Sequence, residues 1–139
     1  MDRINTDFLK RYSDNFKLPI ELHSANRYNR LKRIKTRLSP KFRELAKLLE
    51  EYCFDEEYYF VYPLYYGNNK FHWVDIYFPN KLAVIITNEF EYVMRRAGST
   101  NPKLNNLKEF ECLEVIDWDT PKEVIEKICI KLDDIQGVD

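Results

Sequence analysis

The chain has few of the residues that mark the most recognisable functional sites. Its 139 residues include only three glycines, three cysteines and two histidines. So few glycines argue against a glycine-rich loop that binds phosphate. Three cysteines with no CxxC spacing argue against a disulfide framework and against a structural zinc site. His23 and His72 have no partner at metal-ligand spacing, so they predict no metal site either.

Long apolar runs are also missing. Every apolar run is shorter than ten residues, whereas a membrane-spanning helix needs about 20. We therefore expect no membrane partner. Residues 1–16 have neither the apolar core of a signal peptide nor the acid-poor composition of a transit peptide. Cys53, Cys112 and Cys129 lie among apolar neighbours, which predicts buried thiols in an intracellular, reducing compartment.

The chain does contain a marked separation of charge. The net charge is −1, but residues 22–43 carry eight basic residues and no acid, so the rest of the chain carries −9. Such asymmetry predicts an anionic partner for the basic segment. The alternative is a solvated helix whose charges pair with the protein's own acids. The candidate nucleic-acid-binding residues are Arg27, Arg30, Lys32, Arg33, Lys35, Arg37, Lys41 and Arg43.

Hydrophobic periodicity predicts a basic N-terminal helical arm over residues 1–38 and an α/β domain over residues 39–139. In the arm, Leu31, Ile34 and Leu38 follow helical spacing and are expected to face inward. The domain is predicted to follow the order α-β-β-β-α-β-α, with a small mixed sheet flanked by helices. The expected helices are 24–38, 40–53, 102–110 and one from 121 onward; the expected strands are 58–66, 70–78, 82–87 and 112–118.

One carboxylate, Asp75, lies within an otherwise apolar hairpin. A charge among apolar strand residues must be paired, coordinated to a metal or exposed. Alternation places Trp73, Asp75 and Tyr77 on one face of their strand. Across the predicted three-residue turn, Ile85 is expected opposite Asp75, and Thr87 opposite Trp73.

This element order, with an aspartate in VDIYFP, resembles the core of the restriction-endonuclease-like, or PD-(D/E)xK, superfamily. Catalysis in that family uses an aspartate on the first hairpin strand and Glu-x-Lys or Asp-x-Lys on the second. These groups hold a divalent cation and help to activate water. Asp75 matches the first position, whereas Ile85 and Thr87 replace the expected acid and lysine.

Within that superfamily the sequence is most similar to the RAP domain, a short module associated with organellar RNA-binding proteins. The similar segments are VDIYFPNKLAVII, GSTNPKLNNL and CLEVIDWD, within about residues 70–120, although Asn88 replaces the usual glycine after the second strand. The resemblance implies a pseudo-nuclease that binds RNA without cutting it. It also implies a component of a ribonucleoprotein, such as an organellar ribosome, in the mitochondrion or alternatively the cytoplasm.

The sequence leaves two alternatives open. An active nuclease would combine Asp75 with a second carboxylate and with Lys103 as the lysine, and would need Mg²⁺. The second carboxylate would be Glu44, expected on the inward edge of helix 40–53, or Glu89 or Glu91 after the third strand. A structural subunit would contact protein neighbours through the acidic remainder of the chain. For RNA binding, Tyr28, Trp73 and Tyr77 are candidate stacking residues, with core packing as the alternative for Trp73. Without a metal, we expect Asp75 to bond to Lys103 or to a backbone amide.

Overall fold

A computed structural model describes residues 12, 14–16, 27–53, 55–67, 69–95 and 101–136. The predicted start of the first helix at Ser24 and the side chain of Arg27 lie outside the described parts. The elements are α2 (Arg27–Thr36), α3 (Pro40–Tyr52), β1 (Tyr59–Gly67), β2 (Lys70–Phe78), β3 (Leu82–Thr87), α4 (Glu89–Met94), α5 (Pro102–Asn106), β4 (Cys112–Ile116) and α6 (Pro121–Gln136).

The four strands form one mixed sheet in the order β1-β2-β3-β4. The first three strands are antiparallel, and β4 runs parallel to β3. Asn69 and Asn80 adopt positive φ angles of 61° and 62° in the two tight turns between the antiparallel strands, as short hairpin turns require. A parallel pair needs a longer crossover, and here the crossover contains α4 and α5. The predicted α/β fold, a small mixed sheet flanked by helices, is confirmed.

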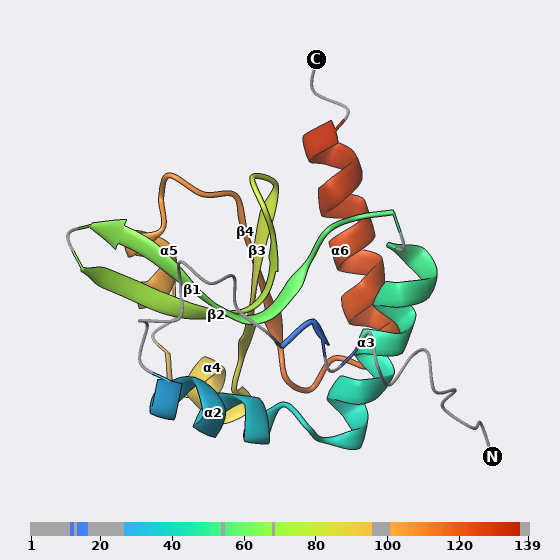
Figure 1. Ribbon diagram of the computed structural model, residues 1–139, viewed down its shortest axis with the longest axis horizontal. Coiled ribbons are helices and arrows are strands. Elements are labelled where there is room, and N and C mark those ends of the chain that lie inside the picture. The colour runs from blue at the N-terminus through green and yellow to red at the C-terminus, as the bar shows by residue number, and fades with distance from the viewer. Residues whose placement is uncertain are drawn as a thin grey trace.

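The helices cover the two faces of the sheet unequally (Figure 1). On one face α3 and α6 pack side by side and enclose the larger hydrophobic cluster, which includes Phe60, Phe78 and Ile128. Tyr12 and Phe16, from the N-terminal arm, belong to this cluster. On the other face a smaller cluster forms around Leu107, just after α5. Among the described residues, no helix has the length and apolar character to cross a membrane.

Local signals fix where the helices begin. Ser39 Oγ accepts a hydrogen bond from Phe42 N and caps α3, as expected. Thr120 Oγ1 accepts a hydrogen bond from Glu123 N and caps α6, while the same hydroxyl donates to Glu123 Oε1. The segment after β3, expected to be mainly loop, forms the short helix α4 instead. Asn88, which stands where the RAP-like pattern has glycine, caps this helix with a φ of −59° and so does not adopt a left-handed conformation.

The orientation of α2 differs from the prediction. Leu31 and Leu38 are 58% and 44% exposed, whereas Arg30 is only 9% exposed and Ile34 is partly buried. The helix therefore turns an arginine-containing face toward the sheet. The reason lies in the sheet, which offers polar acceptors instead of an apolar surface at the place where α2 docks.

Candidate functional site

The sheet is irregular at Asp75, where backbone pairing is interrupted on both sides of β2. Toward β1, Val61 and Asp75 form no pair, although their neighbours do. Val61 has a φ of 53°, a left-handed conformation that is rare for a β-branched residue. Toward β3, the pairing stops at Ile76 and Val84. Strand backbone groups at this point therefore need partners outside the ladder.

The interruption changes which side chains share a face of β2. Trp73 packs in the cluster beneath α3 and α6, whereas Tyr77 packs in the cluster on the α5 side. The prediction that both share the face of Asp75 is therefore wrong, because strict alternation requires an uninterrupted pleat. The predicted register, in which Phe78 faces Leu82, is confirmed next to the turn but does not extend as far as Asp75.

Both carboxylate oxygens of Asp75 have partners. Oδ1 accepts from Arg37, at 2.7 Å from Nε and 2.5 Å from Nη2. Oδ2 accepts from the backbone N–H of Ile86 at 2.6 Å, so the side chain replaces a ladder bond. The expected bond to a backbone amide is present. The cationic partner is Arg37 of the basic segment, and such charge-assisted hydrogen bonds are among the stronger ones in proteins.

Arg30 fixes the other end of α2. Its Nε donates to the carbonyl of Val61 at 3.0 Å, and its Nη2 donates to the carbonyl of Phe60 at 3.4 Å. Burial lowers the pKa of this guanidinium. Arg30 and Arg37 are two helical turns apart and therefore lie on the same side of α2. The helix is thus held on the sheet by Arg30 within it and by Arg37 directly after its last residue.

The other side of α2 points away from the sheet. We call Tyr28, Leu31, Lys32, Arg33 and Lys35 the outward face of α2, because all five side chains are exposed; Arg33 lies at its edge, toward Arg37 and Lys103. Within the part of the chain that the structure describes, no acidic side chain forms an ion pair with its three cations. These charges are available to an external anion.

The eight predicted basic residues therefore have different environments. Arg30 and Arg37 are bound to the sheet, and Lys41 donates to the carbonyl of Asp117. Arg43 is half-buried on α3. Nucleic-acid binding by these residues stays a prediction. The structure separates the arginines bound to the sheet from the exposed cations of α2, which sequence spacing alone did not do.

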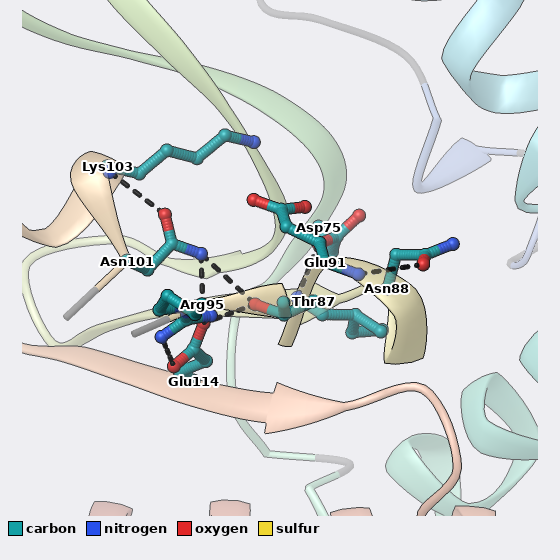
Figure 2. Close-up of polar contacts among 9 residues, drawn as sticks. Asp75, Thr87, Asn88, Glu91, Arg95, Asn101, Lys103 and Glu114 are labelled. Atoms are coloured by element: carbon teal, nitrogen blue, oxygen red, sulfur yellow. Dashed lines mark hydrogen bonds and ion pairs between the residues drawn. The ribbon is translucent and has the colours of Figure 1, made fainter. Parts of the chain in front are cut away.

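Lys103, the predicted substitute for the catalytic lysine, lies near Asp75 (Figure 2). Its Nζ donates to the carbonyl of Trp73 at 3.1 Å. Burial lowers the pKa of the Lys103 ammonium, and the neighbouring carboxylate of Asp75 opposes that shift. The charge of Arg33 on α2 also lowers the pKa of Lys103, and the charge of the exposed Glu91 on α4 raises it.

The other predicted metal ligands do not join Asp75. Glu44 is exposed on α3, so its expected inward position is wrong; the apolar side chains of α3 occupy the buried face. Glu89 is exposed at the start of α4. In the described residues, no group of three or more His, Cys, Asp or Glu side chains could hold a metal. One carboxylate oxygen of Asp75 binds the guanidinium of Arg37 and the other binds the backbone amide of Ile86. The predicted ligands therefore do not fit Mg²⁺, which needs several oxygen ligands around one site.

A second polar network surrounds Glu114 on β4, and sequence reasoning missed it (Figure 2). Arg95 donates to both carboxylate oxygens, at 3.0 and 2.6 Å. Asn101 donates at 2.9 Å, and the hydroxyl of Thr87 also donates. Burial alone would raise the pKa of Glu114, but these hydrogen bonds and the Arg95 charge lower it to about 2. The sequence offered one indication of this network, namely that Glu114 is the single charged residue in the otherwise apolar strand CLEVI.

The three candidate stacking residues also have different environments. Trp73 is only 8% exposed and belongs to the core, which makes it unavailable as a stacking platform. Tyr77 is partly buried, with its ring centroid 4.7 Å from that of Tyr62. Tyr28, by contrast, is 75% exposed on α2. Among the three, only Tyr28 presents an open aromatic ring.

Comparisons of the chain with protein-family models, with curated proteins and with solved structures found no match.

Proposed function

We propose that this chain is a non-catalytic, RNA-associated protein in which α2 binds phosphates. The observation that carries the proposal is the division of α2 into two sides. Arg30 and Arg37 hold the helix on the sheet, while Lys32, Arg33 and Lys35 remain exposed on the outward face. Because the helix is already held in place, binding RNA phosphates does not cost the entropy of ordering it, and this favours binding.

The arrangement of the sheet supports a nuclease-like scaffold for this helix. From α3 onward the order is α-β-β-β-α-α-β, with β4 parallel to β3. Apart from one additional short helix, this follows the α-β-β-β-α-β order of the restriction-endonuclease-like superfamily. The RAP-like segments favour RNA over DNA as the partner. The acidic remainder of the chain would repel phosphates, which suits contact with protein neighbours in a ribonucleoprotein.

The partners of Asp75 favour a structural role over catalysis. A metal-dependent nuclease would need this carboxylate to bind the cation, and here it binds Arg37 and the amide of Ile86. Asp75 thereby positions the helix that carries the proposed RNA contacts. In this proposal the residue that marks the family's catalytic position has become an anchor for binding.

A binding titration with a short labelled RNA tests the proposal. The triple variant K32A/R33A/K35A should weaken binding by about tenfold and flatten its dependence on salt between about 50 and 200 mM. For three phosphate contacts on a single strand, the slope of log K against log salt should fall by about 2. A salt-independent affinity of the parent protein would contradict the proposal.

A matched control removes the same charge elsewhere. Lys70, Lys108 and Lys122 are exposed on other elements, so K70A/K108A/K122A should keep the parent affinity. RNA integrity should be followed in the same samples with Mg²⁺ or Mn²⁺ added. Cleavage that disappears in Asp75→Ala would favour the nuclease alternative and overturn the non-catalytic assignment.

A further inference from the structure

We infer that the RNA bound by the outward face of α2 is single-stranded, with Tyr28 as the side chain on which a base stacks. This inference rests on the proposed function and names its substrate class. The observations that carry it are the position and exposure of one aromatic ring among cations.

Tyr28 lies in line with two of the cations. Tyr28, Lys32 and Lys35 are spaced by four and then three residues, so they form one stripe along the helix. The stripe is roughly 10 Å long at 1.5 Å of rise per residue. Figure 1 shows α2 at the periphery of the molecule, away from the packed pair α3 and α6. A strand lying along α2 would therefore meet the ring and both ammonium groups.

Tyr28 combines exposure with cationic neighbours. Its side chain is 75% exposed, and Leu31 beside it is 58% exposed, whereas Phe90, 73% exposed on α4, lies between Glu89 and Glu91. Tyr12 and Tyr58, by contrast, are 8% and 7% exposed and pack against Phe60. The outward face of α2 thus combines cations with open apolar surface, which matches a ligand with both phosphates and accessible base faces.

A duplex would contact the cations of the outward face of α2 but not its exposed apolar side chains. In double-stranded RNA the base faces are covered by their neighbours, and proteins contact mainly phosphates and 2′-hydroxyls. The cations of α2 could bind such phosphates, but Tyr28 and Leu31 would find no base to cover. In a single strand the bases can turn outward and stack on an aromatic ring. The exposed ring therefore favours a single strand.

The test compares Tyr28→Ala on a single-stranded RNA and on a duplex of the same sequence. Tyr28→Ala should weaken single-strand binding by about five- to 100-fold, the range for loss of one base–aromatic stack, and leave duplex binding unchanged. Tyr28→Trp should restore single-strand binding. Tyr52→Ala is the matched control, because Tyr52 is 63% exposed on α3 without a cationic stripe; it should bind like the parent.

The outcomes separate this inference from the proposed function. Equal weakening on both RNAs, or none on the single strand, would overturn the stacking role of Tyr28. If K32A/R33A/K35A still bound RNA more weakly than the parent, α2 would keep its phosphate-binding role although Tyr28 does not stack on a base. If the parent protein bound neither RNA, both proposals would be wrong.

Discussion

The Asp75 carboxylate is held 2.5 Å from the guanidinium of Arg37, which lies 38 residues earlier in the chain. This ion pair joins the two features that stand out in the sequence, the charged hairpin and the basic segment. Its side chains are only 13% and 26% exposed, so solvent screens it less than a surface pair. The same carboxylate also closes a gap in the sheet through the amide of Ile86.

Asp75→Asn should therefore destabilise the protein. The substitution removes the charge that Arg37 needs and weakens the acceptor for Ile86 N–H. We expect the free energy of unfolding to fall by about 1–3 kcal/mol, the range for a partly buried group that loses a charged partner. Urea denaturation of parent and variant measures this. A variant that is as stable as the parent would contradict the anchoring role.

A double-mutant cycle isolates the pair itself. Arg37→Met combined with Asp75→Asn should cost less than the sum of the two single changes, because the second substitution removes a partner that the first has already lost. We expect a coupling energy of about 1 kcal/mol or more. Strictly additive effects would mean that the two residues stabilise the fold independently.

The cations of α2 should separate into stability residues and binding residues. Arg30→Met leaves the carbonyls of Phe60 and Val61 without a donor, so unfolding should become easier by about 1–3 kcal/mol. Lys32→Met removes the same charge from the outward face of α2 and should change stability by less than about 0.5 kcal/mol. Denaturation and RNA titration on both variants check this. Only Lys32→Met should reduce the salt dependence of binding.

Apart from α4, the order of helices and strands was predictable from sequence because the signals that determine it are local. The caps at Ser39 and Thr120 and the turn before Lys81 depend on residues a few positions away. The orientation of α2 was not predictable in this way. Leu31 and Leu38 have the spacing of a buried face, but the surface beneath α2 consists of the carbonyls and the carboxylate at the break in the sheet.

The candidate site was predictable only in part. Asp75 could be singled out because a charge in an apolar strand needs a partner, but the identity of that partner depends on tertiary contact with α2. Glu114 presented the same kind of signal in CLEVI. Its partners, Arg95, Asn101 and Thr87, come from three other segments, and a single sequence contains no local pattern that connects them.

Glu114 should make stability depend on acid pH. Its pKa is lowered from 4.5 to about 2 in the folded state, so its carboxylate stabilises the fold above about pH 4.5. This stabilisation is lost as the pH falls through the range between those values. Glu114→Gln should cost at most about 3.5 kcal/mol at pH 7, at about 1.4 kcal/mol per pKa unit. The cost should vanish near pH 2.

Urea denaturation at several pH values checks this dependence. Glu111→Gln is the control, because Glu111 is a neighbour in sequence with a side chain that is 61% exposed; its stability profile should follow that of the parent. If Glu114→Gln lost as much stability at pH 2 as at pH 7, the effect would come from packing and not from the carboxylate charge.

The three thiols should resist modification in the folded protein. Burial, and next the neighbouring Cys129, raise the pKa of Cys53 to about 12, and burial also raises the pKa values of Cys112 and Cys129. Because the thiolate is the reactive form, a thiol reagent at pH 8 should modify no cysteine at the rate of a free thiol. All three should react once urea unfolds the chain.

Cys129→Ala should speed the modification of Cys53, since it removes the adjacent thiol and opens the packing between α3 and α6. Rapid modification of one thiol in the folded parent would show that this cysteine is more accessible and more acidic than its environment allows.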